Sequence, residues 1–435
     1  MFMEKVQFLI GAGTSGSGKT TLALGLMRAL CKRGLKVQPF KCGPDYIDTK
    51  HHAAATGRAS INLDTFLASS EHVKTLYTKY GRNADACVTE GVMGLFDGYS
   101  KAQGSSADIA TILDIPVIIV VNSKSMAYSA ASMLFGLKNF MPGLNIAGVI
   151  FNFVSSEKHY TILRKAAEDA GIPSLGYIRR EAAIEIPSRH LGLNIDSDFC
   201  FDKFADLIAS EVEKSIDLDR IIEICTRTFP ENEIPGRGAE GTLKISVARD
   251  EAFNFYYEEN VDILRHAGQV TFFSPLHDSE LPPTDFLYLP GGYPELHLPE
   301  LSQNRAMLSS VREYCNGGGK VFAECGGMMY LCEKITDKEG NSFDMAAVLP
   351  RQATIERMKL TLGYRKVVTQ DGREFRGHEF HYSRLLPGAG KDTTVKVLNA
   401  RNESVESEIL RYKNVLATYI HFYWGEHEIP ISQIF

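Results

Sequence analysis

Short, almost continuously apolar segments alternate with longer amphipathic stretches over the first 200 residues of the chain. We expect these segments to be strands, at residues 6–10, 36–40, 86–89, 117–121 and 146–151. Strands that lack a polar alternation are buried on both faces, as in a parallel sheet. Between the first two strands, Leu22, Leu26 and Leu30 recur at helical spacing, which predicts a helix over residues 20–32. The alternation of strand and helix predicts an α/β fold with a mostly parallel sheet and right-handed crossovers.

The alternation stops at residues 229–242 and then restarts. This stretch reads FPENEIPGRGAEGT and is rich in proline, glycine and charge, which is typical of a linker. After it we expect a helix over residues 260–268 and strands at residues 243–248, 269–273, 286–289 and 320–323. The sequence therefore predicts two α/β domains, at residues 1–228 and 243–435, joined by the linker 229–242.

Composition excludes several classes of protein. The chain has 435 residues, of which 44% are hydrophobic, so it can bury more than one core. Its 47 basic and 53 acidic side chains give a net charge of −6, which argues against a general nucleic-acid binder. No apolar run approaches the roughly 18 residues of a membrane helix. We expect no signal peptide, and the eight cysteines form no CxxC pair, so we expect a reducing cytoplasm rather than disulfides or a zinc knuckle.

Residues 13–20, GTSGSGKT, match the phosphate-binding pattern GxxxxGK[ST]. The match follows an expected strand and opens an expected helix, which is the context that the pattern requires. Gly13, Gly16 and Gly18 let backbone N–H groups turn inward around phosphate oxygens. Lys19 would reach the β- and γ-phosphates, and the hydroxyl of Thr20 would ligate Mg²⁺. The alternative is a glycine-rich turn that only caps the helix.

Four carboxylates lie near the expected phosphate site. Glu90 ends an apolar strand, Asp97 lies between glycines, and Asp45 and Asp48 follow the second strand in the run KCGPDYID. Acids beside an anionic phosphate require a cation between them, either Mg²⁺ or an ammonium-like nucleophile. The alternatives are a solvated strand end for Glu90, an Asp-Gly turn for Asp97 and a helix cap at Asp48.

A second candidate site surrounds Cys325. An expected strand ends in Glu-Cys-Gly-Gly at residues 324–327, so the thiol lies at a sharp turn before a helix. We expect the helix N-terminus to lower the pKa of the thiol and to supply N–H donors for an oxyanion. Glycines in LPGGYPE, residues 289–295, could add further donors, and His421 could activate the thiol. The alternative for Cys325 is a small buried core residue.

These blocks together resemble the cobyrinic acid a,c-diamide synthase family. The resemblance rests on six segments that span nearly the whole chain: GTSGSGKT, KCGPDYID, EGVMGLFDG, LPGGYPE, ECGG and HEFHYS. It implies an N-terminal domain similar to dethiobiotin synthetase and a C-terminal class I glutamine amidotransferase domain. It also implies that ATP phosphorylates the a and c acetate carboxylates of a corrin ring, and that ammonia from glutamine then displaces the phosphate.

The resemblance implies a role for each matching position. Cys325 is the glutaminase nucleophile and His421 its base. The ATP loop includes Gly13, Lys19 and Thr20, and Asn152 resembles an adenine contact. The positions tied to Mg²⁺ and the acyl phosphate are Asp45, Asp48, Glu90 and Asp97. The chain departs from many class I glutaminases at Tyr423, where they carry a glutamate two residues after the histidine; Glu426 is one candidate to orient His421.

The substrates implied are ATP, L-glutamine and a corrinoid tetrapyrrole, with no nucleic acid or membrane partner, and a homodimer is left open. Lys50, His51, His52 and Arg58 could pair with substrate carboxylates, and residues 376–383 could form a substrate or interdomain wall. Hydrogenobyrinic acid or a nickel sirohydrochlorin would suit the same chemistry. A P-loop ATPase switch is less well supported, because residues 14 and 15 lack the lysine usual in such switches. A dethiobiotin-type ligase with an inert appendage predicts no dependence on glutamine.

Overall fold

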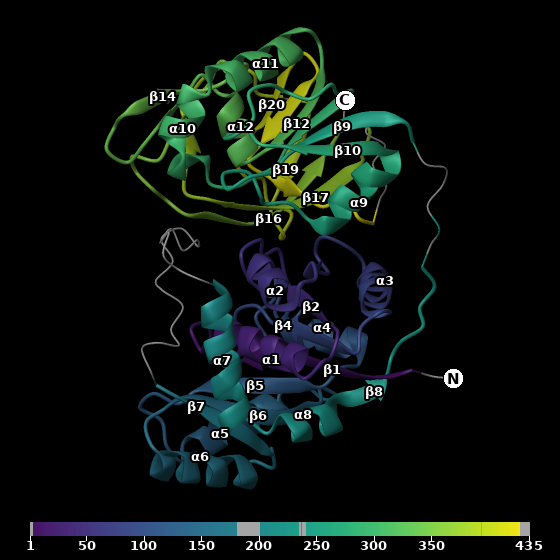
Figure 1. The fold of residues 1–435 in the computed structure, drawn as a ribbon, viewed down its shortest axis with the longest axis vertical. Helices are drawn as coiled ribbons and strands as arrows, with labels where there is room; N and C mark the ends of the chain where they lie inside the picture. The colour runs from purple at the N-terminus through teal and green to yellow at the C-terminus, as the bar shows by residue number, and fades with distance from the viewer. Residues whose placement is uncertain (1–2, 181–200, 235, 237–240, 393, 427–435) are drawn as a thin grey trace. The chain divides into compact units, whose positions relative to one another are not determined.

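The computed structural model describes residues 3–180, 201–234, 236, 241–392 and 394–426. The chain divides into two compact units (Figure 1). Unit 1 comprises Met1–Thr65 and Ser69–Ile234, and unit 2 comprises Phe66–Ala68 and Pro235–Phe435. No helix of the described part has the length and apolar character needed to cross a bilayer.

Within its described residues, unit 1 is built on an eight-stranded sheet in the order β3-β2-β4-β1-β5-β6-β7, with β8 paired to the start of β1. All neighbours are parallel except β8, which runs antiparallel to β1. The strands are β1 (Glu4–Ala12), β2 (Val37–Cys42), β3 (Ile61–Leu63), β4 (Ala86–Glu90), β5 (Val117–Asn122), β6 (Ile146–Val154), β7 (Ser174–Arg179) and β8 (Thr226–Thr228). Because the central strands β1, β4 and β5 are buried along almost their whole length, their sequences are continuously apolar.

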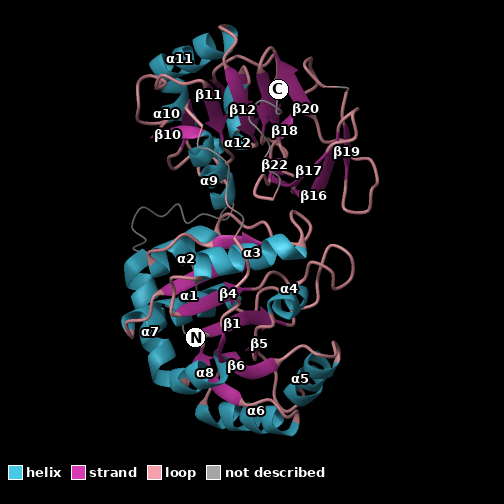
Figure 2. Cartoon of the chain, turned by 90° about the vertical axis from the view of Figure 1, so that its right-hand side faces the viewer, coloured by secondary structure: helices cyan, strands magenta, loops and turns pink. Residues whose placement is uncertain are grey.

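Helices cover both faces of this sheet. They are α1 (Lys19–Lys32), α2 (Asp48–Thr56), α3 (Ser70–Gly81), α4 (Ser106–Leu113), α5 (Ala130–Asn139), α6 (Glu157–Asp169), α7 (Phe201–Ser215) and α8 (Leu218–Cys225). Leucines of α1 pack with Ile208 and Val212 of α7 and with alternate residues of β1 to form one core. Figure 2 shows α5 on the opposite side of the sheet from α7.

Unit 2 repeats the α/β pattern around a six-stranded sheet, counted over its described residues, in the order β10-β9-β11-β12-β21-β20. Its strands are β9 (Leu243–Ala248), β10 (Gly268–Phe273), β11 (Phe286–Leu289), β12 (Lys320–Glu324), β20 (Ile409–Tyr412) and β21 (Val415–Thr418). Only β20 is antiparallel to its neighbour among these described strands. The helices are α9 (Glu258–Ala267), the 3₁₀ helix η2 (Pro294–Leu296), α10 (Leu298–Gln303), α11 (Arg305–Asn316) and α12 (Gly326–Leu331).

Two small sheets complete the described part of unit 2. The first has the order β14-β13-β15-β18, and the second has the order β19-β16-β17-β22. Their strands are β13 (Lys334–Thr336), β14 (Ser342–Asp344), β15 (Gln352–Thr354), β16 (Thr361–Val368), β17 (Glu374–His381), β18 (Arg384–Leu385), β19 (Lys396–Leu398) and β22 (His421–Phe422). Antiparallel pairing of β17 with β22 sets His378 opposite His421.

The predicted fold class is confirmed: a mostly parallel sheet with helices on both faces is followed by a second α/β unit. The helix predicted at residues 260–268 is present as α9. It begins two residues earlier, at Glu258, and ends one residue earlier, at Ala267, because Gly268 already begins β10. Part of the predicted linker, residues 235 and 237–240, lies outside the described residues. The boundaries 1–228 and 243–435 therefore stay a prediction.

Candidate functional sites

The phosphate-binding pattern forms a tight loop between β1 and α1. Gly16 and Gly18 have φ values of 74° and 84°, in the left-handed region that a side chain disfavours. A Cβ added to Gly18 would lie 2.1 Å from Nδ2 of Asn152, so the space there admits only glycine. The loop leads directly into the N-terminus of α1, whose first N–H groups have no partner within the helix and can bind an anion.

Lys19 lies at the start of α1 and is 8% exposed. Its Nζ donates to the carbonyl of Met93 at 2.7 Å, which joins the phosphate loop to residues 91–98. Burial lowers the pKa of Lys19 from its usual value, and Glu90 opposes that shift. The ammonium therefore lies at the phosphate loop beside the N-terminus of α1, where it can contact an anionic phosphate.

Thr20, Asp48 and Glu90 form one buried cluster. The Thr20 hydroxyl donates to Oε1 of Glu90 at 2.7 Å and to Oδ2 of Asp48 at 3.4 Å. Lys41, at the end of β2, places its Nζ 2.9 Å from Oδ2 of Asp48 and 3.1 Å from Oε1 of Glu90. The cluster therefore lies where the carboxyl ends of β2 and β4 meet the first turns of α1 and α2. Open α/β sheets bind ligands at this end of their strands.

The charges of Lys41 and Glu90 stabilise each other within this cluster. Burial alone would lower the pKa of Lys41, but Asp48 and Glu90 raise it well above its usual value. Burial alone would raise the pKa of Glu90, but Lys41 lowers it. His52 adds a contact of 2.6 Å from Nε2 to Oε2 of Glu90, and its Nδ1 lies 3.0 Å from the Ser60 hydroxyl. The sequence interpretation of His52 as a substrate contact missed this role in holding Glu90.

The side-chain carboxylates of Asp45 and Asp97 both accept hydrogen bonds from backbone N–H groups close by in the sequence. Oδ1 of Asp45 accepts the N–H groups of Ile47 and Asp48, at 2.9 and 2.8 Å, and so caps the start of α2. Burial, with Asp48 nearby, raises the pKa of Asp45 to about 6. Asp97 is exposed, and its Oδ2 accepts the N–H of the buried Gly94 at 2.9 Å. Neither carboxylate hydrogen-bonds to Thr20, and their sequence-derived roles in catalysis stay predictions.

The Thr20, Asp48 and Glu90 oxygens fit a magnesium ion. Mg²⁺ prefers oxygen ligands and is commonly held by one or two carboxylates together with substrate phosphates. Among the described residues no group of three or more histidine, cysteine or acidic side chains forms a metal centre. The oxygens of Thr20, Asp48 and Glu90 have the ligand chemistry that Mg²⁺ prefers, and substrate phosphates could supply further ligands.

The remaining residues singled out from the sequence in unit 1 each have contacts outside the cluster of Thr20, Asp48 and Glu90. Asn152, near the end of β6, donates from Nδ2 to the carbonyl of Ser17 at 3.1 Å, so it lies against the phosphate loop. The ring of His51 stacks on Phe201 at 5.5 Å. Burial lowers the pKa of Lys50 to about 7. Arg58 donates to Oε1 of Gln38 at 3.0 Å, which commits it to the fold rather than to the acidic cluster.

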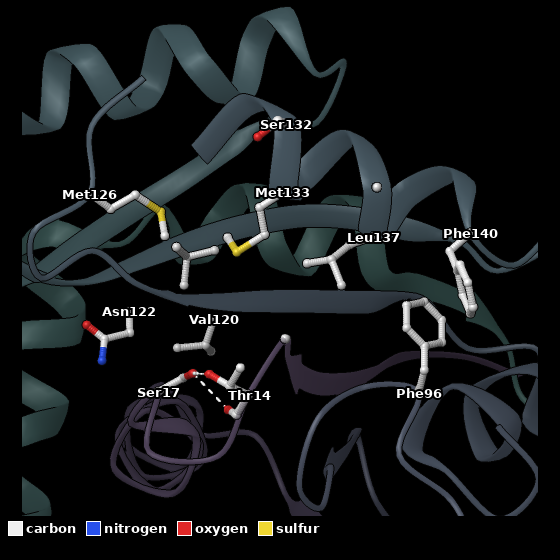
Figure 3. A pocket seen from close by; sticks show the side chains of 13 residues that line it. Thr14, Ser17, Phe96, Val120, Asn122, Met126, Ser132, Met133, Leu137 and Phe140 are labelled. Carbon is white, nitrogen blue, oxygen red and sulfur yellow. Dashed lines mark hydrogen bonds between the residues drawn. The ribbon is translucent and has the colours of Figure 1, made fainter. Parts of the chain in front are cut away.

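Sequence reasoning missed a cavity of about 550 Å³ beside the phosphate loop (Figure 3). Thr14 and Ser17 of the loop form its polar edge. The rest is mainly apolar and comes from β5, α5 and the adjoining segments: Phe96, Val120, Val121, Met126, Met133, Leu137 and Phe140. The Phe96 and Phe140 rings meet at 4.8 Å. The signal available in the sequence was the excess of apolar residues in and after α5.

Cys325 lies at the sharp turn between β12 and α12. Its φ of 48° is unusual for a residue with a side chain, and such strain persists only where the surroundings impose it. The N–H of Cys325 donates to the carbonyl of Thr418 at 2.7 Å. A Cβ on Gly327 would lie 2.2 Å from the carbonyl oxygen of Leu289, which explains the glycine after the turn. This is the geometry of a nucleophile elbow.

The expected low thiol pKa is wrong. Cys325 is 4% exposed, and burial raises the pKa of its thiol well above the usual value, with Glu295 adding to the shift. The desolvation of a thiolate outweighs the partial charge of α12, a helix of six residues. The thiol therefore requires a base rather than ionising by itself.

His421 is the candidate base predicted from the sequence. It is 1% exposed in β22, and burial, with His378 and His381 nearby, lowers its pKa to about 3. The imidazole is therefore neutral at neutral pH, but the same lowering makes it a weak base, so taking the thiol proton requires a neighbouring group that stabilises the imidazolium. A Cβ on Gly291 would lie 2.1 Å from Cε1 of His421, and one on Gly326 would lie 3.1 Å from the carbonyl oxygen of Gly292. The two glycines of LPGG thus adjoin both the base and the turn that carries Cys325.

Residues 376–383 belong to this same region. His378 of β17 pairs with His421, and His381 stacks on Tyr419 at 3.7 Å between ring centroids. A cavity of about 520 Å³ opens beside Tyr419 and His381. Its lining carries both charge signs: Arg351, Arg357, Lys359, Arg365, Glu379, Arg384, Glu406 and Glu408. Such a lining can bind a zwitterion or a carboxylate.

Comparison with known proteins identifies both units. Residues 8–193 match the CobQ/CobB/MinD/ParA nucleotide binding domain, and residues 244–429 match the CobB/CobQ-like glutamine amidotransferase domain. A cobyrinate a,c-diamide synthase of Picrophilus torridus is 40% identical over 440 residues, with 97% of this chain and 96% of the relative covered. One from Dehalococcoides mccartyi is 39% identical over 445 residues, with the same coverage. One from Leptospira interrogans is 40% identical over 438 residues, again with 97% and 96% covered.

Solved structures match single parts of the chain. The crystal structure of a glutamine amidotransferase is 17% identical with a TM-score of 0.31 and covers 44% of this chain and 95% of that one. The signal recognition particle 54 kDa protein of Aeropyrum pernix is 17% identical with a TM-score of 0.31 and covers 50% of this chain and 49% of that one.

Proposed function

The chain belongs to the cobyrinate a,c-diamide synthase family, and we propose that it catalyses the ATP-dependent, glutamine-hydrolysing amidation of the a and c acetate carboxylates of cobyrinic acid. The observation that carries the proposal is the presence of two separate sites in one chain, a phosphate loop and a thiol elbow, that match two domain families. We assign residues 1–228 to the synthetase domain, 229–242 to the linker and 243–435 to the glutaminase domain.

Unit 1 would activate the carboxylate. A carboxylate does not react with ammonia, because it is a poor electrophile and lacks a leaving group. Attack of its oxygen on the γ-phosphorus of ATP gives an acyl phosphate and ADP, and ammonia then displaces phosphate to form the amide. Lys19 and the N–H groups at Gly13, Gly16 and Gly18 would hold the phosphates. We keep Asn152 as the adenine contact, a role compatible with its place against the loop at Ser17.

Thr20, Asp48 and Glu90 would hold Mg²⁺. The ion would neutralise charge on the transferred phosphoryl group. Lys41 already pairs with these two carboxylates, at 2.9 and 3.1 Å, and so offsets their charge before nucleotide binds. Asp45 would act by fixing the start of α2 and hence Asp48, and Asp97 by shaping the loop that meets Lys19 through Met93.

Unit 2 would release ammonia from glutamine. His421 takes the proton of the Cys325 thiol as the sulfur attacks the side-chain amide. N–H groups around Gly292 and Gly326 would stabilise the oxyanion, since the two glycines approach closely. The proton on His421 passes to the departing nitrogen, and water then hydrolyses the glutamyl thioester to glutamate.

The tetrapyrrole combines an apolar ring with peripheral carboxylates. We place its ring at the 550 Å³ cavity of unit 1, which is mostly apolar and opens beside Thr14 of the phosphate loop. That placement would set a peripheral carboxylate near the γ-phosphate position. Hydrogenobyrinic acid and nickel sirohydrochlorin share this chemistry, and product masses from reactions with each tetrapyrrole would distinguish them.

We also propose a cytoplasmic, reducing environment and leave a homodimer as a further proposal. The seven cysteines in the described part are free thiols, which is compatible with that compartment. The assembly can be measured directly by light scattering of the purified chain.

The decisive test compares glutamine and ammonia as nitrogen sources in Cys325→Ala. We expect the variant to lose glutamine-dependent amidation by at least ~1000-fold, because the nucleophile is gone. With ammonium chloride it should retain amidation within about 3-fold, because unit 1 is untouched. Lys19→Ala should lose both activities. Cys315→Ala, which removes a buried thiol on α11, is the matched control and should keep both. Normal use of glutamine by Cys325→Ala would refute the assignment.

A further inference from the structure

Glu324 is the last residue of β12 and directly precedes the candidate nucleophile. It is 1% exposed, and a carboxyl group is seldom buried so completely unless it is paired. Its Oε2 accepts the hydroxyl of Tyr288 at 2.7 Å, and its Oε1 accepts the N–H of Phe422 at 2.9 Å. The carboxyl group therefore joins the end of β12 to β11 and β22.

Phe422 directly follows the candidate base. The bond from its N–H to Glu324 fixes the backbone at the position where the His421 side chain leaves the strand. Oε2 of Glu324 also lies 4.0 Å from Nδ1 of His421, and both side chains are 1% exposed. One carboxyl group is thus adjacent to the thiol in sequence and to the imidazole in space.

We propose that Glu324 is the positioning residue that orients His421, in place of the acid that is missing at Tyr423. This inference rests on the proposed glutaminase function. A carboxylate that accepts Nδ1–H fixes the tautomer in which the Nε2 lone pair can take the thiol proton. It also stabilises the imidazolium that forms. The 4.0 Å separation needs to shorten by about 1 Å for a hydrogen bond, and such bonds commonly tighten when substrate binds.

The protonation of Glu324 gives the proposal a measurable consequence. Burial raises the pKa of this carboxyl group to about 8, against the lowering effect of the Tyr288 and Phe422 donors. The titratable groups near it are Tyr288, Cys325 and, at 4.0 Å, His421. His378 and His381 lie near His421, whose ring also hydrogen-bonds the backbone of Phe255. Because the ionised form is the one that accepts Nδ1–H, glutamine hydrolysis should rise as the pH rises through about 8.

The test measures glutamine hydrolysis by Glu324→Gln in the full-length chain. We expect kcat to fall by at least ~100-fold with KM for glutamine within about 3-fold, because the substrate pocket is unchanged while the base is misoriented. The rise in activity near pH 8 should disappear, since an amide does not titrate. Ammonia-dependent amidation should stay within about 3-fold of wild type, which shows that unit 1 is intact, and an unchanged thermal transition of Trp424 fluorescence should show that unit 2 is folded. Glu339→Gln, an exposed carboxylate in the turn after β13, is the matched control.

Tyr288→Phe provides a second, milder variant. It keeps the ring that packs against Phe322 and Trp424 but removes the hydroxyl that donates to Oε2. Losing a donor to the ionised form raises a carboxyl pKa. We therefore expect the limb of the pH profile near pH 8 to move to higher pH, with a fall in kcat at pH 7.5 of about 3- to 10-fold.

Three results would overturn the inference. The first is a kcat of Glu324→Gln within about 3-fold of wild type. The second is a thermal transition of Trp424 fluorescence in Glu324→Gln that falls below the assay temperature, which would mean that Glu324 only supports the fold of unit 2. The third is a loss of kcat in Glu426→Gln while Glu324→Gln stays active, which would assign the role to Glu426. Cys325→Ala separates these results from a failure of the proposed function, since continued glutamine hydrolysis by that variant would remove the glutaminase assignment itself.

Discussion

At the scale of single residues, Lys41 shows how a buried charge is tolerated. Its side chain is 3% exposed and lies between Asp48 and Glu90, which are 7% and 1% exposed. Moving any one of these charges out of water is costly, and their mutual attraction offsets that cost. Lys41 therefore pairs with both carboxylates at the place where we propose Mg²⁺ and phosphate to bind.

Removing the charge of Lys41 should be strongly destabilising. Lys41→Met keeps most of the aliphatic stem but leaves two buried carboxylates without their cation, and we expect a loss of about 3–5 kcal/mol in the free energy of unfolding. Urea titration followed by far-UV circular dichroism measures it. Lys36→Met, at an exposed position just before β2, should change stability by less than about 0.5 kcal/mol. Equal stability of the two variants would contradict the account of the cluster.

At the scale of elements, α5 has two different apolar faces. Leu137 and Met133 line the cavity beside the phosphate loop, whereas Phe135 on the same helix is 60% exposed. A helix repeats every 3.6 residues, so positions two apart point in very different directions. Apolar side chains of α5 therefore have different roles according to the face of the helix on which they lie.

A pair of substitutions on α5 tests the proposed tetrapyrrole site. Leu137→Glu places a negative charge in the cavity and should repel a polycarboxylate, raising its KM by at least ~10-fold. Glutamine hydrolysis should change by less than about 2-fold, because unit 2 is not altered. Phe135→Glu is the same kind of change outside the cavity lining and should leave the KM within about 3-fold. Steady-state kinetics with varied tetrapyrrole measures both, and an equal KM in the two variants would place the ring elsewhere.

At the scale of the whole molecule, each unit has hydrophobic cores of its own. The α1 and α7 core belongs to unit 1, and two further clusters around β9, β11 and β12 belong to unit 2. The chain has a single tryptophan, Trp424, which is 3% exposed and packs on Tyr288 and Phe322 of unit 2. Its fluorescence therefore reports on the folding of unit 2 alone.

Because Trp424 fluorescence follows unit 2 alone, the effect of nucleotide on the unfolding of each unit can be measured separately. ATP with Mg²⁺ binds unit 1 in our proposal, and ligand present at 100 times its Kd stabilises the folded state by about 2.7 kcal/mol. Thermal unfolding followed by circular dichroism should show one transition moving several degrees upward. The transition followed by Trp424 fluorescence should move by less than about 1 °C. Equal shifts by both probes would mean that the two units unfold as one.

Much of the architecture could be read from local pattern. The buried strands β1, β4 and β5 and the helix α1 lie where continuous or helically spaced apolar residues predict them. The phosphate loop and the Cys325 turn were also visible, because glycine at fixed spacing carries a backbone requirement of its own. The short strands β13 to β22 were not predicted, since two to eight residues with mixed polarity give no period to detect.

The candidate sites could likewise be predicted only in part from the sequence. Sequence alone determined which residue types could do the chemistry, because Lys19, Glu90 and Cys325 each follow a recognisable local pattern, whereas His421 was singled out only as a partner for Cys325. Only the tertiary structure decided what surrounds them: that His52 holds Glu90, that burial raises rather than lowers the thiol pKa, and that Glu324 adjoins His421. The physical reason is that solvation, charge pairing and hydrogen bonding depend on neighbours in space, which segments distant along the chain supply.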